Sequence, residues 1–378
     1  MASFRKHENG TWEYRIRYRD PISGMYKEKS KRGFKKKKEA ELAAQEMERK
    51  LAEGFEQTDT SLAEYLKTWL NEYKKGTVRK NTYRLHESNI NNHIIPYFKS
   101  LLLTDLKPII YQKFLNHLSA QGYSRRTVEI IHSTMTDALQ KAVILRKIDK
   151  NPCTGATIKG DKTNNSIQYI ESKDIPTFLQ QAYKYGYIYW IFFKTLIETG
   201  MRKGEAAALQ WSDIDLKART ISISKSLDFT AKTKDDLFGD TKTFNSKRQI
   251  TISQALANDL KLHVKYQNQN KTELNDIYHH DLNLVFCRKD GNFLPKSSLF
   301  NAFRKILKRS NLPLLPIHSL RHTHAVLLLE SGADMKYVQE RLGHGSMRVT
   351  ADIYAHISRK IDQVSMDRFE EYTKGMLK

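Results

Sequence analysis

The chain has 378 residues, too many for one ordinary domain, so we expect two or three domains. Its 64 Lys and Arg residues against 42 Asp and Glu residues give a formal net charge of +22, and such an excess favours a polyanionic partner, nucleic acid above all. A hydrophobic content of 39% supports real cores and excludes a disordered basic tail.

The composition also bears on the compartment. The two cysteines, Cys153 and Cys287, lie far apart and in no metal-like spacing, so we expect neither a disulfide framework nor a cysteine metal site. No apolar run follows the basic residues near the N-terminus, and no stretch approaches the roughly 18 apolar residues of a membrane helix. We therefore expect a soluble protein of a reducing cytoplasm, with no membrane association.

Residues 1–56 are predicted to form a small three-stranded sheet plus one helix. The dipeptide Asn9-Gly10 is typical of a tight hairpin and would join a strand at Ser3–His7 to one at Thr11–Arg19. In the second strand apolar and charged side chains alternate strictly, which gives the sheet an apolar face and a cationic face. A helix from about Lys38 to Glu53 would cover the apolar face with its alanines.

We interpret the cationic face as a surface for phosphates and a DNA groove, with a merely solvated face as the alternative. The candidate DNA-binding residues on this face are Arg15, Arg17, Arg19, Lys27 and Lys29.

Residues 60–156 are predicted to form an all-α bundle, because apolar residues recur at helical spacing. The expected helices cover Leu62–Tyr73, Tyr83–Ile95, Ile109–Leu118 and Val128–Leu145, with Pro108 in a first turn and Ser124 as an N-cap. Basic residues cluster at the corners of the bundle, where they would clamp a duplex. These candidates are Lys74, Lys75, Arg79, Lys80, Arg125 and Arg126.

Residues 157–168 are polar and poor in apolar side chains, and we predict a linker there. Residues 169–378 would then form a mixed, mainly-α domain with a C-terminal tail. Its expected helices are Ser172–Tyr185, Ile188–Thr199 and Gly204–Leu209, and its expected strands are Thr220–Leu227 and Arg248–Ile252. The whole chain is thus predicted to have a multidomain α+β fold.

The third domain carries residue types that suit the cleavage of a phosphodiester. They lie in Glu198-Thr199-Gly200-Met201-Arg202-Lys203-Gly204-Glu205, in His318-Ser319-Leu320-Arg321-His322 and in Leu342-Gly343-His344, with Tyr354 ten residues after His344. Metal-free cleavage needs a nucleophile, cations for the nonbridging oxygens and an acid for the leaving 5′ oxygen. Guanidinium groups suit those oxygens because they donate two parallel hydrogen bonds. Gly200 and Gly343 are each expected to end a helix.

These segments, in this order and at these intervals, resemble the tyrosine recombinases (the phage integrase family), and the resemblance covers the whole chain. It implies a metal- and ATP-independent enzyme that needs no cofactor and forms a 3′-phosphotyrosine through Tyr354. Arg202 and Arg321 would grip the scissile phosphate, and His344 would hydrogen-bond a nonbridging oxygen. His318 would act as general acid/base or position the phosphate.

The resemblance also implies supporting residues and partners. Glu205 would support the site, and Lys242 is the best match to the lysine that protonates the 5′ oxygen, with Lys232, Lys234 and Lys247 nearby. The hairpin that carries Lys242 is longer than usual because of the insert Thr230–Asp240. The implied partners are double-stranded DNA at core and arm attachment sites, three further copies in a homo-tetramer, an excisionase and a host DNA-bending protein. The enzyme would act on the DNA of a bacterial host.

Other interpretations fit parts of this pattern. A type IB topoisomerase shares the Arg, Lys, His and Tyr chemistry, and an inactive DNA-binding regulator would keep the basic surfaces. His318 and His322 have the spacing of helical zinc ligands, but Ser319 stands where a metalloprotease carries Glu, and no third ligand is evident. A lone Tyr among 19 is more often a packing residue, so the assignment of Tyr354 depends on its position after His344.

Overall fold

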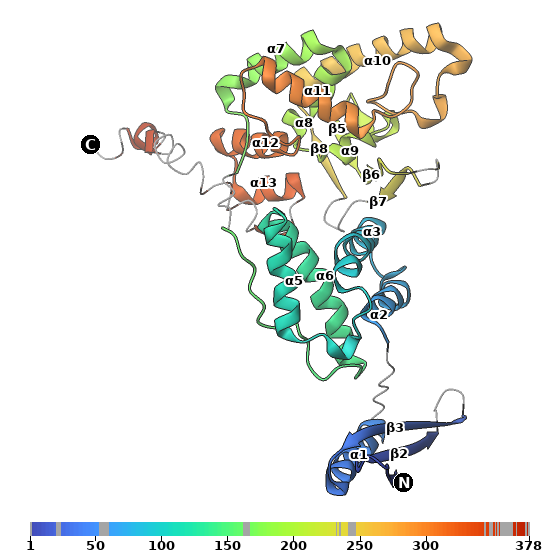
Figure 1. Ribbon diagram of the computed structural model, residues 1–378. Coiled ribbons are helices and arrows are strands. Elements are labelled where there is room, and N and C mark those ends of the chain that lie inside the picture. Colours follow the sequence, from blue (N-terminus) through green and yellow to red (C-terminus); the bar gives the residue numbers. More distant parts are fainter. Residues whose placement is uncertain are drawn as a thin grey trace. The chain divides into compact units, whose positions relative to one another are not determined.

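The computed structural model (Figure 1) describes residues 2–19, 24–52, 60–161, 167–231, 233, 236–240, 247–343, 345–347, 351, 353, 355, 366–367, 369–374 and 376. The chain divides into two compact units, Met1–Thr163 and Asn164–Lys378, and the division falls inside the predicted linker. None of the helices in the described ranges is long and apolar enough to cross a membrane.

The N-terminal sheet of the first unit is antiparallel with the strand order β1-β2-β3. Its strands are β1 (Ala2–Lys6), β2 (Trp12–Arg19) and β3 (Tyr26–Phe34). The first hairpin forms where Asn9-Gly10 predicts it, with a three-residue loop closed by the hydrogen bond from His7 N to Thr11 O at 2.8 Å. Gly10 has a φ of 79°, the left-handed conformation that the last residue of such a loop needs.

Helix α1 (Lys37–Ala52) packs on the apolar face of this sheet, as the alternation predicts. Tyr14, Ile16 and Ala44 are buried there. Hydrophobic burial of this kind is the main stabilising contribution for the small N-terminal sheet and its helix. The alternation does not predict the environment of Glu13, which is fully buried although it is charged. A register shift between Trp12 and Tyr14 accompanies this departure from the regular pairing with β3.

The helical part of the first unit has its own hydrophobic core, which includes Trp69, Tyr111 and Phe114. Its helices are α2 (Leu62–Trp69), α3 (Lys80–Asn89), α4 (Ile95–Phe98), α5 (Pro108–Ala120) and α6 (Arg125–Ile144), with π-helical segments Leu70–Lys74 after α2 and Ile90–Ile94 after α3. Pro108 lies in the first turn of α5, and the Ser124 hydroxyl accepts a hydrogen bond from Thr127 N at the start of α6, both as predicted.

The second unit is mainly helical. Its helices are α7 (Ile175–Tyr185), α8 (Tyr187–Thr199), α9 (Lys203–Ala207), α10 (Gln254–Leu274), α11 (Lys296–Arg309), α12 (Ser319–Glu330) and α13 (Met335–Leu342). The apolar run of α8 places Ile191, Phe192 and Phe193 at the centre of the main core. A smaller core joins α12 to α13 through Val326, Leu329 and Val338, among other residues.

Two small sheets complete the described part of this unit. One has the order β4-β5-β8, from β4 (Ile214–Asp215), β5 (Thr220–Ile223) and β8 (Arg248–Thr251), and the other pairs β6 (Lys225–Leu227) with β7 (Phe238–Asp240). The single strand predicted over Thr220–Leu227 is therefore wrong, because the chain divides it between two sheets. The physical reason is the insert Thr230–Asp240, whose last residues supply β7 as a separate partner for β6.

Candidate active site

The C-terminal end of α13 lies at the centre of the candidate site. Gly343 ends the helix in the left-handed conformation, with a φ of 67°, as predicted. The last carbonyl groups of a helix have no partner within it and carry a negative partial charge. Here the consecutive backbone oxygens of Arg341, Leu342 and Gly343 accept hydrogen bonds from side chains of other elements. We call these three oxygens the α13 carbonyl row.

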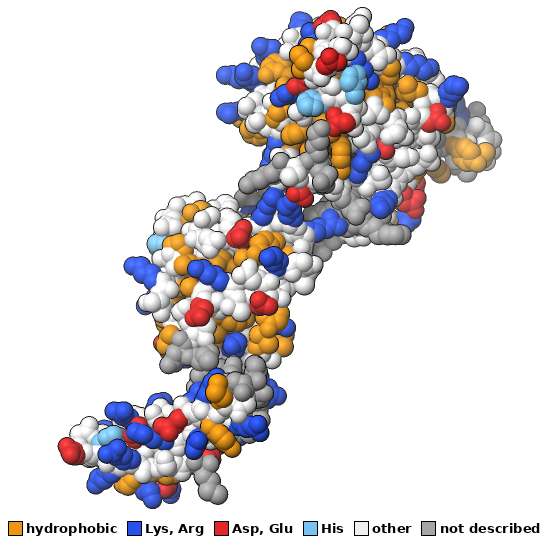
Figure 2. Space-filling model, turned by 90° about the vertical axis from the view of Figure 1, so that its right-hand side faces the viewer, with side chains coloured by type: hydrophobic (Ala, Val, Ile, Leu, Met, Phe, Trp, Pro, Cys, Tyr) orange, Lys and Arg blue, Asp and Glu red, His pale blue; other side chains and the backbone are white. Residues whose placement is uncertain are grey.

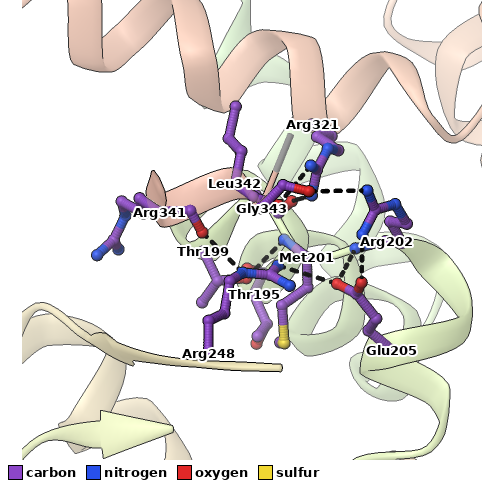
Figure 3. A network of polar contacts seen from close by, with 11 residues as sticks. Thr195, Thr199, Met201, Arg202, Glu205, Arg248, Arg321, Arg341, Leu342 and Gly343 are labelled. Atoms are coloured by element: carbon purple, nitrogen blue, oxygen red, sulfur yellow. Dashed lines mark hydrogen bonds and ion pairs between the residues drawn. The ribbon is translucent and has the colours of Figure 1, made fainter. Parts of the chain in front are cut away.

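Each oxygen of the α13 carbonyl row accepts a hydrogen bond from a different arginine (Figure 3). Arg248 Nε donates to Arg341 O at 2.7 Å, Arg321 Nη2 to Leu342 O at 2.5 Å, and Arg202 Nη2 to Gly343 O at 3.2 Å. The row thus brings together Arg202 and Arg321, which lie in different segments of the sequence. Their assignment to a scissile phosphate stays a prediction.

Arg202 reaches this row from the turn between α8 and α9. Gly200 ends α8 with a φ of 64°, and a Cβ added at Gly200 would lie 2.5 Å from the His324 and Leu342 side chains. Only glycine therefore fits the turn without a shift of its neighbours. Arg202 then takes the N-cap position of α9, in an extended backbone conformation.

Glu205 holds Arg202 from inside α9. Its carboxylate accepts hydrogen bonds from Arg202 N at 2.9 Å and Arg202 Nη1 at 2.7 Å, and Arg248 Nη2 donates to it at 3.0 Å. Burial alone would raise the pKa of the Glu205 carboxyl, but the Arg248 and Arg202 guanidinium groups lower that pKa below its ordinary value. Glu205 therefore remains ionised. Among the residues described here, it places one carboxylate beside the guanidinium groups of Arg202, Arg248 and Arg321.

Arg321 is only 2% exposed and lies in the first turn of α12. Its Nη1 donates to Gly200 O at the end of α8 at 2.8 Å, and its Nη2 donates to Leu342 O. A guanidinium has five N–H groups, so within the described part of the chain Nε and one N–H on each terminal nitrogen remain for a ligand. Burial, and after it the charge of the nearby Arg202, lowers the pKa of Arg321 to about 9.

His318 precedes α12 as its N-cap residue, with a helical φ of −62°. Its ring meets the His322 ring edge-on at a centroid distance of 5.0 Å. Partial desolvation lowers the pKa of His318 to about 4, and the charges of His322, Arg321 and Arg202 act in the same direction. The imidazole is consequently neutral at pH 7, so that one ring nitrogen can donate and the other accept.

His324 and Arg341 join the helices behind the site, and sequence reasoning did not single out Arg341. His324 Nδ1 donates to Ile197 O at 2.8 Å, and its Nε2 accepts from Arg341 Nε at 3.0 Å. Burial lowers the pKa of His324 to about 3. These contacts fix α12 to α8 and α13. The spacing of the motifs gives no signal for them, because the partner of His324 is a backbone oxygen.

Three predicted site residues, Lys242, His344 and Tyr354, lie outside the described residues, as do Lys232 and Lys234. Within the described residues, no group of three or more His, Cys, Asp or Glu side chains could hold a metal ion.

The cationic face of the N-terminal sheet is ordered by internal contacts. Glu13 accepts a hydrogen bond from His7 at 2.9 Å and forms ion pairs with Arg15 and Arg32 at 3.3 and 3.4 Å. Burial would raise the pKa of Glu13, but His7, Arg15 and Arg32 together lower it to about 2. Arg17 lies over the Tyr26 ring at 4.8 Å, Arg19 Nε donates to Gly24 O at 3.0 Å, and Lys27 and Lys29 lie on β3.

The basic residues at the corners of the bundle fall into two groups. Lys74 lies 2.6 Å from Asp137, and Arg125 Nη1 donates to Ile158 O and Gly160 O at 2.9 and 2.7 Å, so both have structural contacts. The other four, Lys75, Arg79, Lys80 and Arg126, are exposed, and Arg126 pairs with Glu129 at 3.4 Å. Lys and Arg side chains are widespread on the face shown in Figure 2, which agrees with the net charge of +22.

Three family models match this chain. Residues 168–360 match the phage integrase family, residues 61–119 match the N-terminal SAM-like domain of phage integrases, and residues 3–51 match the arm DNA-binding domain. The chain therefore belongs to the phage integrase family. It is accordingly a DNA-binding enzyme, a site-specific recombinase of the tyrosine class, and the class predicted from its sequence is confirmed.

Curated relatives cover most of the chain. A tyrosine recombinase XerC-like protein of Caldanaerobacter subterraneus is 29% identical over 346 residues, which are 86% of this chain and 87% of that protein. The ICEBs1 integrase of Bacillus subtilis is also 29% identical, over 78% of each chain. The integrase of Staphylococcus phage L54a is 28% identical, over 72% of this chain and 82% of that protein.

Solved structures share the fold. The integrase of the Tn1549 transposon, in complex with transposon right-end DNA, aligns with a TM-score of 0.67 at 19% identity, over 82% of this chain and 99% of that one. A lambda integrase dimer bound to a core site aligns with a TM-score of 0.60 at 18% identity, over 93% of each chain. The predicted multidomain α+β fold of the tyrosine recombinase type is thereby confirmed.

Proposed function

We propose that this integrase cuts and rejoins DNA through a 3′-phosphotyrosine on Tyr354 and so integrates and excises a mobile element. The observation that carries the proposal is the convergence of Arg202 and Arg321 on adjacent oxygens at the end of α13, one residue before His344. Two guanidinium groups at this spacing suit the two nonbridging oxygens of one phosphate.

Each residue takes one role in the proposed reaction. The Tyr354 oxygen attacks phosphorus while Arg202 and Arg321 stabilise the charge that grows on the nonbridging oxygens. The bond from phosphorus to the 5′ oxygen breaks, and Lys242 supplies the proton that this oxygen takes up. His344 donates to a nonbridging oxygen, and the neutral His318 positions the phosphate or relays a proton.

Religation is the reverse of this reaction. A 5′ hydroxyl from either duplex attacks the phosphotyrosine and releases the Tyr354 oxygen. One ester bond is exchanged for another at each step, so no ATP is needed.

The proposed organisation assigns a part of the recombination reaction to each domain. Residues 1–56 would bind arm sites, residues 60–156 would bind the core site, residues 157–168 would link them to the rest, and residues 169–378 would perform catalysis. The match of residues 3–51 to an arm DNA-binding domain supports this division and disfavours a type IB topoisomerase. Among the relatives, an ICE integrase, a prophage integrase and a phage integrase favour a mobile element in a bacterial cytoplasm.

The proposed partners are double-stranded DNA and further copies of the chain. A lambda integrase tetramer bound to a Holliday junction shares the fold, which supports a homo-tetramer for this chain. An excisionase and a host DNA-bending protein complete the proposed set of partners.

The proposal is tested by covalent capture of DNA. Core-site duplexes are first selected from a random-sequence pool by adduct formation with the wild-type chain. The selected duplex is then prepared with a nick near the cleavage point, so that religation fails. We expect a denaturant-resistant adduct that survives EDTA and is lost in Tyr354→Phe. An equal adduct in both proteins removes Tyr354 from the role, and strict dependence on a divalent ion contradicts the mechanism. Relaxation of a plasmid without a core site would favour the topoisomerase.

A further inference from the structure

A third arginine, Arg248, belongs to the same cluster although it lies outside the motifs that carry the resemblance. It is the first residue of β8, and its side chain is only 7% exposed. Its Nη2 lies 3.0 Å from Glu205 Oε2, and its Nε donates to Arg341 O at 2.7 Å (Figure 3). One guanidinium therefore bridges α9 and the first oxygen of the α13 carbonyl row.

The bridge to Glu205 determines how Arg202 is held. Arg202 Nη1 donates to Oε1 of Glu205, whereas Oε2 accepts from both Arg202 N and Arg248 Nη2. With both oxygens occupied, the carboxylate has a fixed orientation and shares its charge between two cations. Without Arg248, the buried carboxylate would pair with Arg202 alone, and the positive charge available to a phosphate would decrease.

The bridge to α13 is reciprocal. Arg248 at the start of β8 donates to the Arg341 backbone, while Arg341 Nη1 donates to the backbone oxygen of Thr251, at the end of β8, at 2.9 Å. These two hydrogen bonds in opposite directions fix α13 to β8. The next two oxygens of the row, which hold Arg321 and Arg202, are fixed with it.

We propose that Arg248 is a positioning residue for DNA cleavage: it sets Glu205 and the α13 carbonyl row so that Arg202 and Arg321 meet one phosphate. This inference rests on the proposed function, because the two arginines are assigned to the scissile phosphate there. Arg248 acts on the two arginines through Glu205 and the α13 carbonyl row, so its loss should slow cleavage.

The experiment measures single-turnover adduct formation by the full chain on the nicked core-site duplex described above. Arg248→Gln removes the charge, and Arg248→Lys keeps the charge but cannot bridge Glu205 and Arg341 O with separate nitrogens. Ile306→Val, a methyl deletion in the buried core of α11, controls for lost stability. Each variant is also measured in a Glu205→Gln background.

We expect Arg248→Gln to slow adduct formation roughly 10- to 100-fold, the usual effect of removing a supporting contact. The Kd for the duplex should stay close to that of the wild type, because most affinity comes from phosphate contacts elsewhere. Arg248→Lys should recover part of the rate. In the Glu205→Gln background, Arg248→Gln should add little, because both changes act through one carboxylate.

The pH profile separates positioning from simple stabilisation. Arg248 lowers the pKa of Glu205, so its removal raises that pKa. Adduct formation by Arg248→Gln should then decline at a higher pH than in the wild type as the solution is made acidic, whereas Ile306→Val should keep the wild-type profile.

The inference is overturned if Arg248→Gln is no slower than Ile306→Val, or if its defect leaves the pH profile unchanged and adds fully to that of Glu205→Gln. Both results leave the proposed function intact, since the wild type still forms its adduct. If the wild type forms no adduct that depends on Tyr354, the proposed function fails and the role of Arg248 fails with it.

Discussion

At the residue scale, Arg321 shows how the protein prepares a buried cation for an anion. Its guanidinium donates to two backbone oxygens at the ends of different helices, Gly200 O in α8 and Leu342 O in α13. Helix ends supply only partial negative charge. The guanidinium of Arg321 is thus held in place, but its positive charge is only partly balanced. A negatively charged ligand would balance the rest.

We predict that Arg321→Lys slows single-turnover cleavage by about 10² to 10³-fold, as expected when one donor to the transition state is lost. An ammonium group cannot reach both helix ends and a phosphate oxygen at once. Adduct formation at saturating protein measures the rate, and a filter-binding Kd on the same duplex is the control. A variant with a wild-type rate would remove Arg321 from the phosphate site.

The buried histidines predict a stability that depends on pH. Burial lowers the pKa of His324 to about 3 and that of His263, a buried residue of α10, to about 4, against 6.5 in the unfolded chain. Because the unfolded chain binds these protons first, the free energy of unfolding should be constant above about pH 7 and fall as pH drops toward 4. Urea unfolding at several pH values measures this. A stability that rises on acidification would contradict the buried, neutral state of both rings.

The structure brings together three of the residues that the resemblance to a family assigned to the site. Arg202 contacts Glu205, and Arg202 and Arg321 donate to adjacent oxygens of the α13 carbonyl row, while their roles in the reaction stay predictions. The burial of Glu13 and the bridge by Arg248 were not predictable, because each depends on a pairing between elements that local patterns do not encode. Lys242, His344 and Tyr354 remain predictions, since the structure does not describe them.

At the scale of single elements, helix ends build this site. Gly200 ends α8 and Gly343 ends α13, and both place backbone oxygens against arginines. Sequence reasoning predicted both ends from glycine alone. It missed the division of Thr220–Leu227 into two strands, because an insert that brings its own partner strand leaves the local alternation unchanged.

We predict that Gly200→Ala lowers the free energy of unfolding by about 3 kcal/mol, from left-handed strain together with overpacking against His324 and Leu342. Gly155→Ala is the matched control, since Gly155 also has a positive φ, at 76°, but no atom within 4 Å of an added Cβ. Strain alone should cost the control about 1 to 2 kcal/mol. Equal losses in urea unfolding would show that the turn at Gly200 tolerates a side chain.

At the scale of the whole molecule, the described residues form several separate hydrophobic cores. The N-terminal sheet, the bundle and the second unit each have a hydrophobic cluster of their own. Periodicity does not predict that Arg202 and Arg321 lie near each other in the second unit. That expectation came only from the resemblance to a family.

We predict that removal of residues 1–56 spares adduct formation at the core site, because the bundle and the second unit keep their own cores. Binding to arm-site duplexes should be lost, and binding of the full chain to DNA should weaken steeply with salt as phosphates are neutralised. Gel shifts at several salt concentrations measure both effects. A flat salt response, or arm-site binding by the shortened chain, would contradict the role given to the cationic face.

The most direct measurement of the central claim is the chemical identity of the protein–DNA link. The trapped adduct is digested with a protease and a nuclease, and the peptide that carries nucleotides is sequenced by mass spectrometry. The account predicts one peptide, with Tyr354 esterified to a 3′ phosphate. Attachment to any other side chain, or to a 5′ phosphate, would contradict it.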